Sequence, residues 1–286
     1  MTAWLSLHDL GHVYGDGSVG LDRCSLDIRR GTRNALLGAN GSGKTTLLQH
    51  INGLLKPTHG SVQVDGQPLD YRRSGLSDLR RRVGLVFQNP DRQLISANVF
   101  EDVSFGPLNL GLDDATVRER VSSALAAVGM SEYGERPVHQ LSFGQKKRVC
   151  IAGVLAMQPE LLLLDEPMAG LDAGMQADLL NLLDQLVAQG MTVLLTTHDV
   201  DFAYRWADDL HLLAGGRCLG SFAADQLLEH AALLAAAGHP LPAVVRLHQQ
   251  LAARGQLASD VRPRSLDMLL AQLTLPGGFA GDASRC

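Results

Sequence analysis

The apolar positions of the chain fall into two patterns, which predict two kinds of β-strand. Four short runs are rich in apolar residues, as in strands of a parallel sheet that are buried on both faces. These runs cover residues 32–37, 83–87, 161–164 and 192–196. Partial alternation of apolar and polar residues covers residues 4–8, 25–28 and 61–64. This alternation, followed by the turn signal Asp65-Gly66, predicts a small antiparallel sheet beside the main core.

Helical spacing predicts the elements that join these strands. Asp113 is a favourable N-cap, and the apolar residues after it lie on one face of a helix. Toward the C-terminus the composition shifts to Ala and Leu, and three prolines divide the chain into short helices. Strands that alternate with helices predict an α/β fold. We expect a core at residues 1–221, with a helical subdomain at about 89–158, and a helical C-terminal extension at 222–286.

One segment between a predicted strand and a predicted helix has the pattern of a phosphate-binding loop. It reads Gly38-Ala39-Asn40-Gly41-Ser42-Gly43-Lys44-Thr45 and fits G-x-x-x-x-G-K-[ST] at every fixed position. The glycines let backbone N–H groups converge on an anion without interference from a Cβ atom. Lys44 can reach the β- and γ-phosphates of a nucleotide, and the hydroxyl of Thr45 can bind Mg²⁺. Because the loop opens onto a helix N-terminus, the helix dipole also favours a bound anion.

Two acids follow the leucine run, at the carboxyl edge of the predicted parallel sheet, where ligands of α/β proteins bind. Asp165 can hold Mg²⁺, and Glu166 can orient and polarise an attacking water. The alternative is that both carboxylates only cap the loop. His198 ends another buried strand and is a candidate sensor of the γ-phosphate, although a single histidine is more often structural.

Two more motifs each allow a functional and a structural interpretation. Tyr14 lies in a turn between two predicted strands, where it could stack on an adenine ring or pack on its own sheet. Residues 141–148, Leu-Ser-Phe-Gly-Gln-Lys-Lys-Arg, indicate a helix N-terminus with basic residues in its first turns. Such a start can bind an anion, or it can simply expose Lys146, Lys147 and Arg148 to water.

Composition narrows the class of protein. The 286 residues are 45% hydrophobic, which is typical of a globular chain, and no run of 18 apolar residues predicts a membrane span. The net charge of −5 argues against a general nucleic-acid-binding protein. Cys24, Cys150, Cys218 and Cys286 have no metal-binding spacing, and we expect them to be reduced thiols.

Taken together, these motifs resemble the nucleotide-binding subunit of an ATP-binding-cassette transporter. The resemblance covers residues 3–221 and rests on motif order: Tyr14, the phosphate loop, Gln88, Leu141-Ser142-Phe143-Gly144-Gln145, Asp165-Glu166, Ala169-Gly170-Leu171-Asp172 and His198. It implies a P-loop ATPase core with an antiparallel β subdomain, a helical subdomain and a small helical extension. It also implies ATP and Mg²⁺ as cofactors, with two copies of the chain that sandwich the nucleotide and hydrolyse it.

The resemblance gives each motif a role. The adenine would stack on Tyr14, and the phosphates would be bound by Gly38, Asn40, Gly41, Ser42, Gly43, Lys44, Thr45 and Thr46. Mg²⁺ would be held by Thr45, Gln88 and Asp165. Glu166 would be the catalytic base, Gln88 would touch the attacking water, and His198 would be the switch. From the opposite subunit, the γ-phosphate would be bound by Ser142, Gly144 and Gln145, and Asp172 would cross the dimer interface.

The chain departs from the family pattern at Phe143, where the family usually has a second glycine. Backbone donors need only a compatible conformation, so we expect this signature segment to keep its function with an altered loop flexibility. The Ala169-Gly170 start of the interface loop is a milder variation.

A narrower resemblance concerns the cargo. Residues 87–94 and 99–109 resemble the energy-coupling-factor branch of the family, and residues 145–157 are similar to those of cobalt and nickel uptake ATPases. This resemblance implies import of cobalt or nickel, with cobalt ahead. The protein would sit peripherally on the cytoplasmic face of the inner membrane, docked under integral membrane subunits through which the ion crosses. A vitamin importer that uses the same motor is the alternative.

Two other classes of protein fit less well. Soluble cassette ATPases of DNA repair or translation usually carry two cassettes or a long coiled-coil insertion. Here only 53 residues separate Gln88 from Leu141, with no long heptad run between them, and we expect no nucleic-acid partner. A small-molecule kinase would have no need of the motif at residues 141–145.

Overall fold

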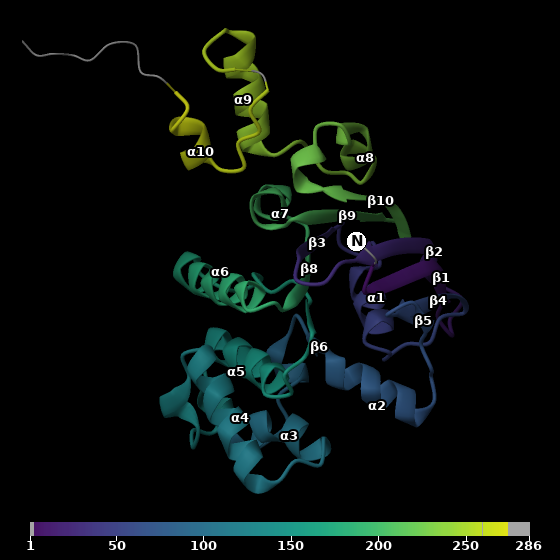
Figure 1. Ribbon diagram of the computed structural model, residues 1–286, viewed down its shortest axis with the longest axis vertical. Helices are drawn as coiled ribbons and strands as arrows, with labels where there is room; N and C mark the ends of the chain where they lie inside the picture. Colours follow the sequence, from purple (N-terminus) through teal and green to yellow (C-terminus); the bar gives the residue numbers. More distant parts are fainter. Residues whose placement is uncertain (1–2, 259, 274–286) are drawn as a thin grey trace, which may run out of the picture.

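A six-stranded sheet runs through the centre of the computed structural model, which describes residues 3–258 and 260–273 (Figure 1). Its strands lie in the order β10-β9-β3-β8-β7-β6. Their bounds are β3 (Arg33–Leu37), β6 (Val83–Val86), β7 (Leu161–Leu164), β8 (Thr192–Thr197), β9 (Asp209–Ala214) and β10 (Arg217–Ala223). Neighbouring strands are parallel except for the hairpin of β9 and β10 at one edge. The four apolar runs of the sequence form β3, β6, β7 and β8, as predicted.

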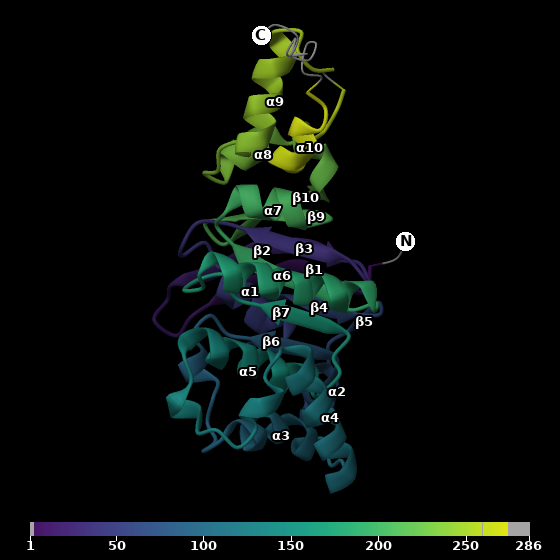
Figure 2. The ribbon, with the colours of Figure 1, turned by 90° about the vertical axis from the view of Figure 1, so that its left-hand side faces the viewer.

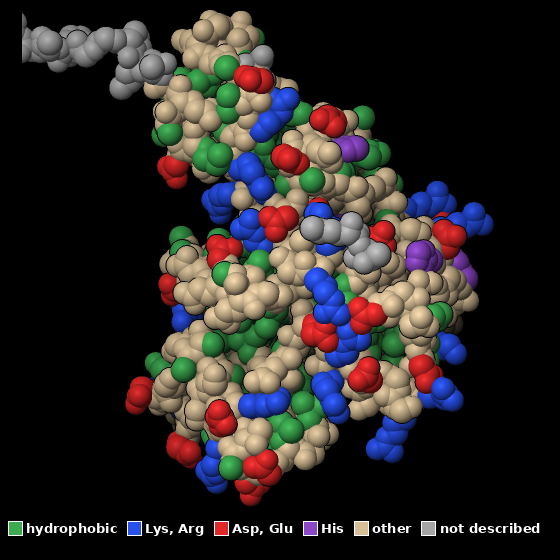
Figure 3. Space-filling view, viewed as in Figure 1, with side chains coloured by type: hydrophobic (Ala, Val, Ile, Leu, Met, Phe, Trp, Pro, Cys, Tyr) green, Lys and Arg blue, Asp and Glu red, His purple; other side chains and the backbone are tan. Residues whose placement is uncertain are grey.

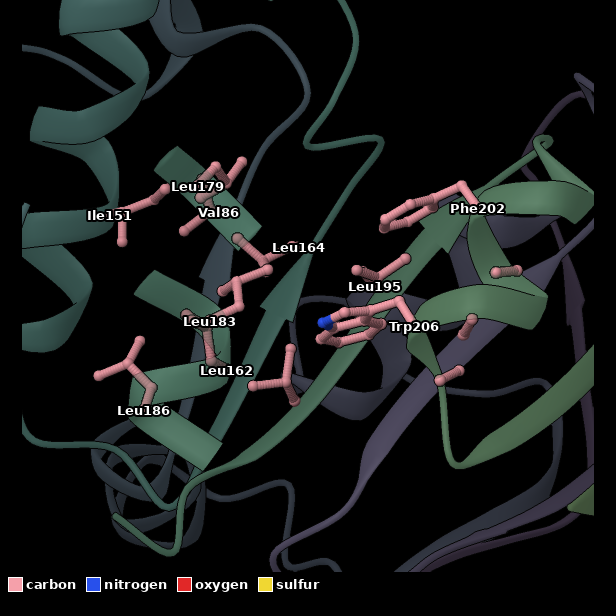
Figure 4. Close-up of a cluster of buried hydrophobic side chains, with 14 of the residues drawn as sticks. Val86, Ile151, Leu162, Leu164, Leu179, Leu183, Leu186, Leu195, Phe202 and Trp206 are labelled. Carbon is pink, nitrogen blue, oxygen red and sulfur yellow. The ribbon is translucent and has the colours of Figure 1, made fainter. Parts of the chain in front are cut away.

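Each face of this sheet packs against its own layer, because successive side chains of a strand point to opposite faces. In β7, Leu162 and Leu164 belong to one buried cluster, and Leu161 and Leu163 belong to the other. The first cluster takes side chains from α5 (Phe143–Leu155), α6 (Ala173–Ala188) and α7 (Val200–Trp206), as Figure 4 shows. The second takes side chains from α1 (Lys44–Ile51) and from the antiparallel sheet.

The antiparallel sheet is also present, in the order β2-β1-β4-β5. Its strands are β1 (Leu5–Val13), β2 (Val19–Ile28), β4 (His59–Val64) and β5 (Gln67–Pro68), so β1 and β2 are longer than the alternation predicts. The register of β1 shifts near Asp9, whose φ is 46°, and a shifted register interrupts the period of two. Gly60 lies beside this bulge, where a Cβ atom would collide with the carbonyl oxygen of Asp9.

The chain between β6 and β7 is mainly helical, as predicted. It contains α3 (Val99–Asn109), α4 (Asp114–Ala127) and α5, which lie together at the end of the molecule next to β6 (Figure 2). The helix α4 begins where the sequence indicates, because the Asp113 carboxylate accepts hydrogen bonds from the N–H groups of Ala115 and Thr116. The preceding helix α2 (Arg73–Arg82) has no counterpart among the predicted elements, since it is strongly polar and leaves most of its side chains exposed.

The C-terminal helices α8 (Ala231–Ala236), α9 (Ala243–Ala253) and α10 (Leu266–Leu270) lie at the opposite end of the molecule (Figure 2). They are fastened to α7 by polar contacts. The Arg264 guanidinium donates to the carbonyl oxygen of Tyr204 at 2.7 Å, and the Asp201 carboxylate accepts the N–H of Ala243 at 2.6 Å. Because α7 follows His198 directly, these contacts connect the C-terminal helices to the carboxyl edge of the central sheet.

The apolar stripe of the last helix is only partly buried. Leu269 packs into the main core, whereas Leu266 and Leu270 are exposed. None of the helices within the described ranges combines the length and the apolar character that a membrane span requires.

The strands β2 and β10 are joined by a disulfide between Cys24 and Cys218, whose Cα atoms are 4.7 Å apart. The expectation of reduced thiols is therefore wrong for these two cysteines. Sequence spacing cannot indicate the pair, because 194 positions separate the two residues and only the packing of the two sheets brings them together. Cys150 is free and buried, and Cys286 lies outside the described residues.

Candidate nucleotide site

The phosphate loop joins β3 to α1 and passes so close to neighbouring backbone that it needs its glycines. Gly43 has a φ of 105°, and a Cβ atom on it would lie 2.6 Å from the carbonyl oxygen of Gly20. A Cβ atom on Gly38 would lie 2.5 Å from the carbonyl oxygen of Leu213. A larger residue at either position would push the loop off its support. In this conformation the start of α1 lines a cavity of about 420 Å³.

This cavity gathers most of the residues that the sequence assigns to ATP and Mg²⁺. Its lining includes Tyr14, Asn40, Gly41, Gly43, Lys44, Thr45, Thr46, Gln88, Asp165 and Glu166. Gly38 and Ser42 are buried residues of the loop itself and are not part of this lining. The lining comes from segments far apart in the sequence, so the fold itself assembles the site at the carboxyl edge of the sheet.

Lys44 is a buried cation of the cavity, with 6% of its side chain exposed. Its Nζ donates to the carbonyl oxygens of Gly38 at 2.7 Å and Ala39 at 3.1 Å. It also lies 3.1 Å from Oε1 of Glu166, but this oxygen accepts no hydrogen bond, so the contact is an ion pair with poor alignment. Lys44 can therefore turn to a phosphate without breaking a well-formed hydrogen bond to the acid.

Asp165 is held in place by two hydroxyl groups. Thr45 Oγ1 donates to one carboxylate oxygen and Thr196 Oγ1 donates to the other, both at 2.7 Å. Asp165 is buried, and the side chain of Gln88 lines the same cavity. Hydroxyl, carboxylate and amide oxygens are ligands that Mg²⁺ prefers in proteins, so the chemistry of Thr45, Asp165 and Gln88 fits a magnesium site.

Glu166 has an unusual backbone conformation. Its φ is 44°, in the left-handed region that costs a non-glycine residue about 1 kcal/mol or more and that is concentrated at functional sites. The Glu166 N–H donates to Thr196 Oγ1 at 2.8 Å, which stabilises this conformation. Oε2 of Glu166 lies 3.1 Å from Nδ1 of His198, so the two candidate residues are in contact. The imidazole of His198 is otherwise largely exposed at the mouth of the site.

Thr196 is a site residue that the sequence analysis missed. Its hydroxyl contacts both acids, accepting from the backbone of Glu166 and donating to the carboxylate of Asp165. A threonine inside a buried apolar strand was a usable signal, because a buried hydroxyl needs a hydrogen-bond partner. The identity of its partners could not be read from the sequence, since they lie 30 and 31 residues away.

The two interpretations of Tyr14 are compatible with each other. Its ring packs against Gly20 of its own sheet, where a Cβ atom would lie 2.7 Å from the ring. Its hydroxyl lies 2.7 Å from Oγ1 of Thr46, next to the phosphate loop. The exposed part of the ring lines the nucleotide cavity, so stacking on adenine stays a prediction.

Comparison with known proteins decides the family. The family model described as ABC transporter matches residues 21–169, which is more than half of the chain. The chain belongs to the ABC transporter family. It is 48% identical to a cobalt import ATP-binding protein of Rhodobacter capsulatus, over 96% of this chain and 98% of that protein. It is 41% identical to an energy-coupling factor transporter ATP-binding protein of Methanospirillum hungatei, over 93% of this chain and 67% of that protein.

Solved ABC structures have the same fold. The CbiO1 structure from Clostridium perfringens, reported as part of the CbiONQ transporter complex, has a TM-score of 0.74 and 38% identity, covering 89% of this chain and 98% of that one. A dimeric cassette in a post-hydrolysis state with ADP and phosphate has a TM-score of 0.69 and 30% identity, covering 77% and 98%. The predicted ABC ATPase fold, the binding of ATP and the ATPase activity of an importer motor are confirmed.

The ABC signature residues lie outside the cavity of their own chain. Ser142 caps α5 and forms a capping box with Gln145, in which each side chain accepts the backbone N–H of the other residue. Gly144 is buried against Met175, whose Sδ would lie 2.6 Å from an added Cβ atom. Ser142, Gly144 and Gln145 are not among the residues that line the cavity around Lys44. Their contact with ATP stays a prediction that requires a second copy of the chain.

The remaining residues of this ABC motif have contacts within the chain. The Asp172 carboxylate accepts the N–H of Met175 at 2.8 Å and caps α6, so its role at a dimer interface stays a prediction. Lys146 and Arg148 form surface ion pairs. Lys147 is only 2% exposed, so the interpretation that all three basic side chains face water is wrong for Lys147.

Proposed function

We propose that this chain is the ATPase motor of a membrane importer for cobalt or nickel and works as a nucleotide-sandwich dimer. One observation supports the dimer above all. The cavity of a single chain contains the phosphate loop, the oxygen ligands for Mg²⁺ and Glu166, but the signature residues Ser142 and Gly144 lie elsewhere. A partner's signature segment would complete the site, and the dimeric relative with bound ADP and phosphate supports this arrangement.

Each residue of the cavity then has a task in hydrolysis. Lys44 and the N–H groups at the start of α1 bind the phosphates. Thr45, Asp165 and Gln88 would hold Mg²⁺, which would supply positive charge to neutralise the phosphates. Glu166 orients the attacking water and takes its proton, and His198 contacts the γ-phosphate while it supports Glu166. Loss of the γ-phosphate removes the contacts that hold the two copies together.

The cargo is proposed from the relatives. The cobalt import protein of Rhodobacter capsulatus aligns over nearly the full length of both chains, which favours cobalt or nickel. The energy-coupling factor relative supports the vitamin importer as the second candidate, because it has the same type of motor. The cargo would not touch this subunit. Among the described residues, no group of three or more His, Cys, Asp or Glu side chains is arranged to hold a metal ion.

A groove at the end of the molecule fits a helix of an integral membrane subunit. It has a volume of about 820 Å³, lies between α2 and α3 (Figure 1), and its floor is mainly apolar. The lining includes Leu54, Leu76, Leu85, Phe87, Phe105 and Met157, with Arg73, Arg80 and Arg81 at the side of α2. Phe87 belongs to the groove and the adjacent Gln88 belongs to the nucleotide cavity. Docking there would connect membrane subunits to the nucleotide and would place the protein on the cytoplasmic face of the membrane.

The sandwich is tested with the variant Glu166→Gln, which keeps the phosphate loop intact. With ATP and Mg²⁺ we expect it to elute as a stable dimer in size-exclusion chromatography, and without nucleotide as a monomer. The double variant Lys44→Ala/Glu166→Gln is the matched control and should stay monomeric with ATP. A Glu166→Gln protein that binds ATP but never dimerises, at any concentration up to about 100 μM, would contradict the sandwich.

The cargo is tested in the complex. We expect the chain to co-purify with integral membrane subunits, and the reconstituted complex to take up labelled Co²⁺ or Ni²⁺ only with ATP and an intact Glu166. Uptake of a labelled vitamin without either ion would establish the second candidate. The ATPase rate per subunit should also rise with protein concentration, whereas a monomeric kinase would show a constant rate.

A further inference from the structure

The side chain of Lys147 is a buried cation that the catalytic scheme above does not use. It lies one turn into α5, just after the signature segment, and it is among the largest fully buried side chains of the described chain. Its Nζ donates to the carbonyl oxygen of Pro167 at 2.7 Å and to that of Ala169 at 2.9 Å. Both carbonyls belong to the loop that follows Glu166 directly. Burial of an ammonium group costs free energy, which the two hydrogen bonds offset. A buried charge that is held in this way calls for a functional explanation.

Phe143 closes this contact from the solvent side. Its ring centroid lies 5.3 Å from Nζ of Lys147, which is a cation–π distance. The ring also covers Gly170, whose φ is 76° and where a Cβ atom would lie 2.8 Å from Cε1 of Phe143. The departure from the family pattern at residue 143 and the buried lysine are therefore parts of one contact between α5 and the loop 167–170.

The backbone around Glu166 is thus fixed on both sides. On the N-terminal side, its own N–H is bonded to Thr196 of β8. On the C-terminal side, the carbonyl of the next residue, Pro167, is bonded to Lys147 of α5. Glu166 itself is in a left-handed conformation, which persists only where the surroundings hold it. A shift of α5 would act on Glu166 through the Pro167 carbonyl.

We propose that Lys147 is a positioning residue that couples the two ATP sites of the dimer through the Pro167 and Ala169 carbonyls. This inference rests on the proposed sandwich, in which the N-terminus of α5 faces the nucleotide held by the partner. When that nucleotide engages Ser142 and Gly144, α5 moves with it, and Lys147 carries the movement to Glu166 of its own chain. ATP bound at one site then places Glu166 of the other site in its catalytic position. Hydrolysis therefore becomes cooperative in ATP.

The test compares Lys147→Met, which replaces the ammonium donor with an unbranched apolar side chain of similar size, with Lys146→Met, the adjacent lysine that pairs with Asp91 at the surface. For Lys147→Met we expect kcat to fall about tenfold, the affinity for ATP to stay within about twofold, and the Hill coefficient for ATP to fall to about 1. Lys146→Met should match the parent chain in all three. Lys147→Gln, whose amide can still donate to one carbonyl, should restore part of kcat and of the cooperativity.

Two further variants keep the inference open to contradiction. Phe143→Gly should keep turnover within about tenfold but lower the Hill coefficient. This variant tests the same contact between α5 and the loop 167–170 if Lys147→Met does not fold. In a Glu166→Gln background, Lys147→Met should still form the ATP-dependent dimer. A dimer that forms while folded Lys147→Met and Lys147→Gln keep the parent kcat and Hill coefficient would overturn the coupling and leave the sandwich intact. Absence of any dimer in Glu166→Gln alone would instead reject the sandwich.

Discussion

The two ends of the central sheet arrange their charged groups in opposite ways. At the amino ends of the strands, arginines and acids pair with one another at the surface, as the interleaved blue and red side chains in the middle of Figure 3 show. The pairs are Arg29 with Asp209, Arg30 with Asp65 and Glu160, Arg33 with Asp208, and Arg82 with Asp65 and Glu160. The hydrogen bond from Arg82 lowers the pKa of the Glu160 carboxyl, so this acid is firmly ionised.

At the carboxyl ends the charges are buried and incompletely paired. Oε1 of Glu166 accepts no hydrogen bond although it faces Lys44, and the backbone of Glu166 is in a left-handed conformation. Strand β7 connects the paired acid at the amino end with the incompletely paired acid at the carboxyl end, because Glu160 precedes this strand and Glu166 follows it. The comparison indicates that full pairing marks a structural carboxylate and that incomplete pairing marks one kept for a ligand. Three of the four predictions below test this distinction, and the other concerns a buried histidine of the same sheet.

The largest effect is expected for Glu166→Gln against Glu160→Gln, two identical substitutions on either side of β7. Loss of a general base lowers a rate by about 10²–10⁴-fold, so Glu166→Gln should reduce steady-state ATPase turnover by at least about 100-fold. Glu160→Gln should leave turnover within about twofold. Similar turnover in the two variants would remove the distinction between the two ends of the sheet.

The second effect concerns stability against pH. His211 on β9 is buried between Asn34 and Ser221, and burial lowers its pKa to about 4. The unfolded chain takes up a proton below pH 6.5 and the folded chain only near pH 4, so stability is lost as the pH falls through this window. From pH 7 to pH 5 this one group should cost about 2 kcal/mol of unfolding free energy.

Urea unfolding at the two pH values measures this loss. His211→Gln should reduce the loss by about 2 kcal/mol, and the exposed control His139→Gln should leave it unchanged. A loss that persists in full in His211→Gln would show that other groups, such as His50, whose pKa burial also lowers to about 4, carry the whole effect.

The third effect compares two buried threonines of β8. Thr196 bonds to Asp165 and Glu166 at the carboxyl end, whereas Thr192 accepts the N–H of Gly31 at the amino end. Thr196→Val should lower kcat about tenfold, equal to about 1.4 kcal/mol of barrier, because both acids lose an anchor. Thr192→Val should change the midpoint of urea unfolding but leave kcat within about twofold. A Thr196→Val enzyme with parental kcat would contradict the assigned role.

The smallest effect is on the stability of Glu160→Gln. The Glu160 side chain is 39% exposed, and solvent screens such ion pairs, so we expect a loss of only about 0.5 kcal/mol at pH 7. The contribution of Glu160 is present above the pKa of the unfolded carboxyl and disappears as the pH falls through its lowered folded value. Parent and variant should therefore converge in urea unfolding at low pH. A constant difference at every pH would assign the loss to packing.

The sequence predicts those residues well whose functional pattern is formed by their neighbours in the sequence. The phosphate loop is one unbroken segment, and the leucine run of β7 with the acids after it is another. The structure brings Lys44 of the first segment and Asp165 and Glu166 of the second to one cavity. Helix α4 was also predictable, because the Asp113 cap and its apolar face lie within one segment.

The residues that the sequence does not reveal depend on contacts between distant segments. Thr196, Lys147 and the pair Cys24–Cys218 acquire their partners only when strands and helices pack. Lys147 shows the limit most clearly, because its neighbours Lys146 and Arg148 are surface residues while Lys147 is buried. Local pattern indicates a polar helix start there, and burial is decided by the loop that folds over it.

Lys44 contacts both the backbone of its own loop and the carboxylate of Glu166. These two contacts suggest how the site would respond differently to ATP and to ADP. This lysine reaches the β- and γ-phosphates of a nucleotide. In the proposed mechanism, a triphosphate would draw the ammonium of Lys44 away from Glu166 and leave that carboxylate free to act on water. A diphosphate lacks the γ-phosphate and would compete less strongly for Lys44, so the ammonium would stay paired with the Glu166 carboxylate until the nucleotide is exchanged.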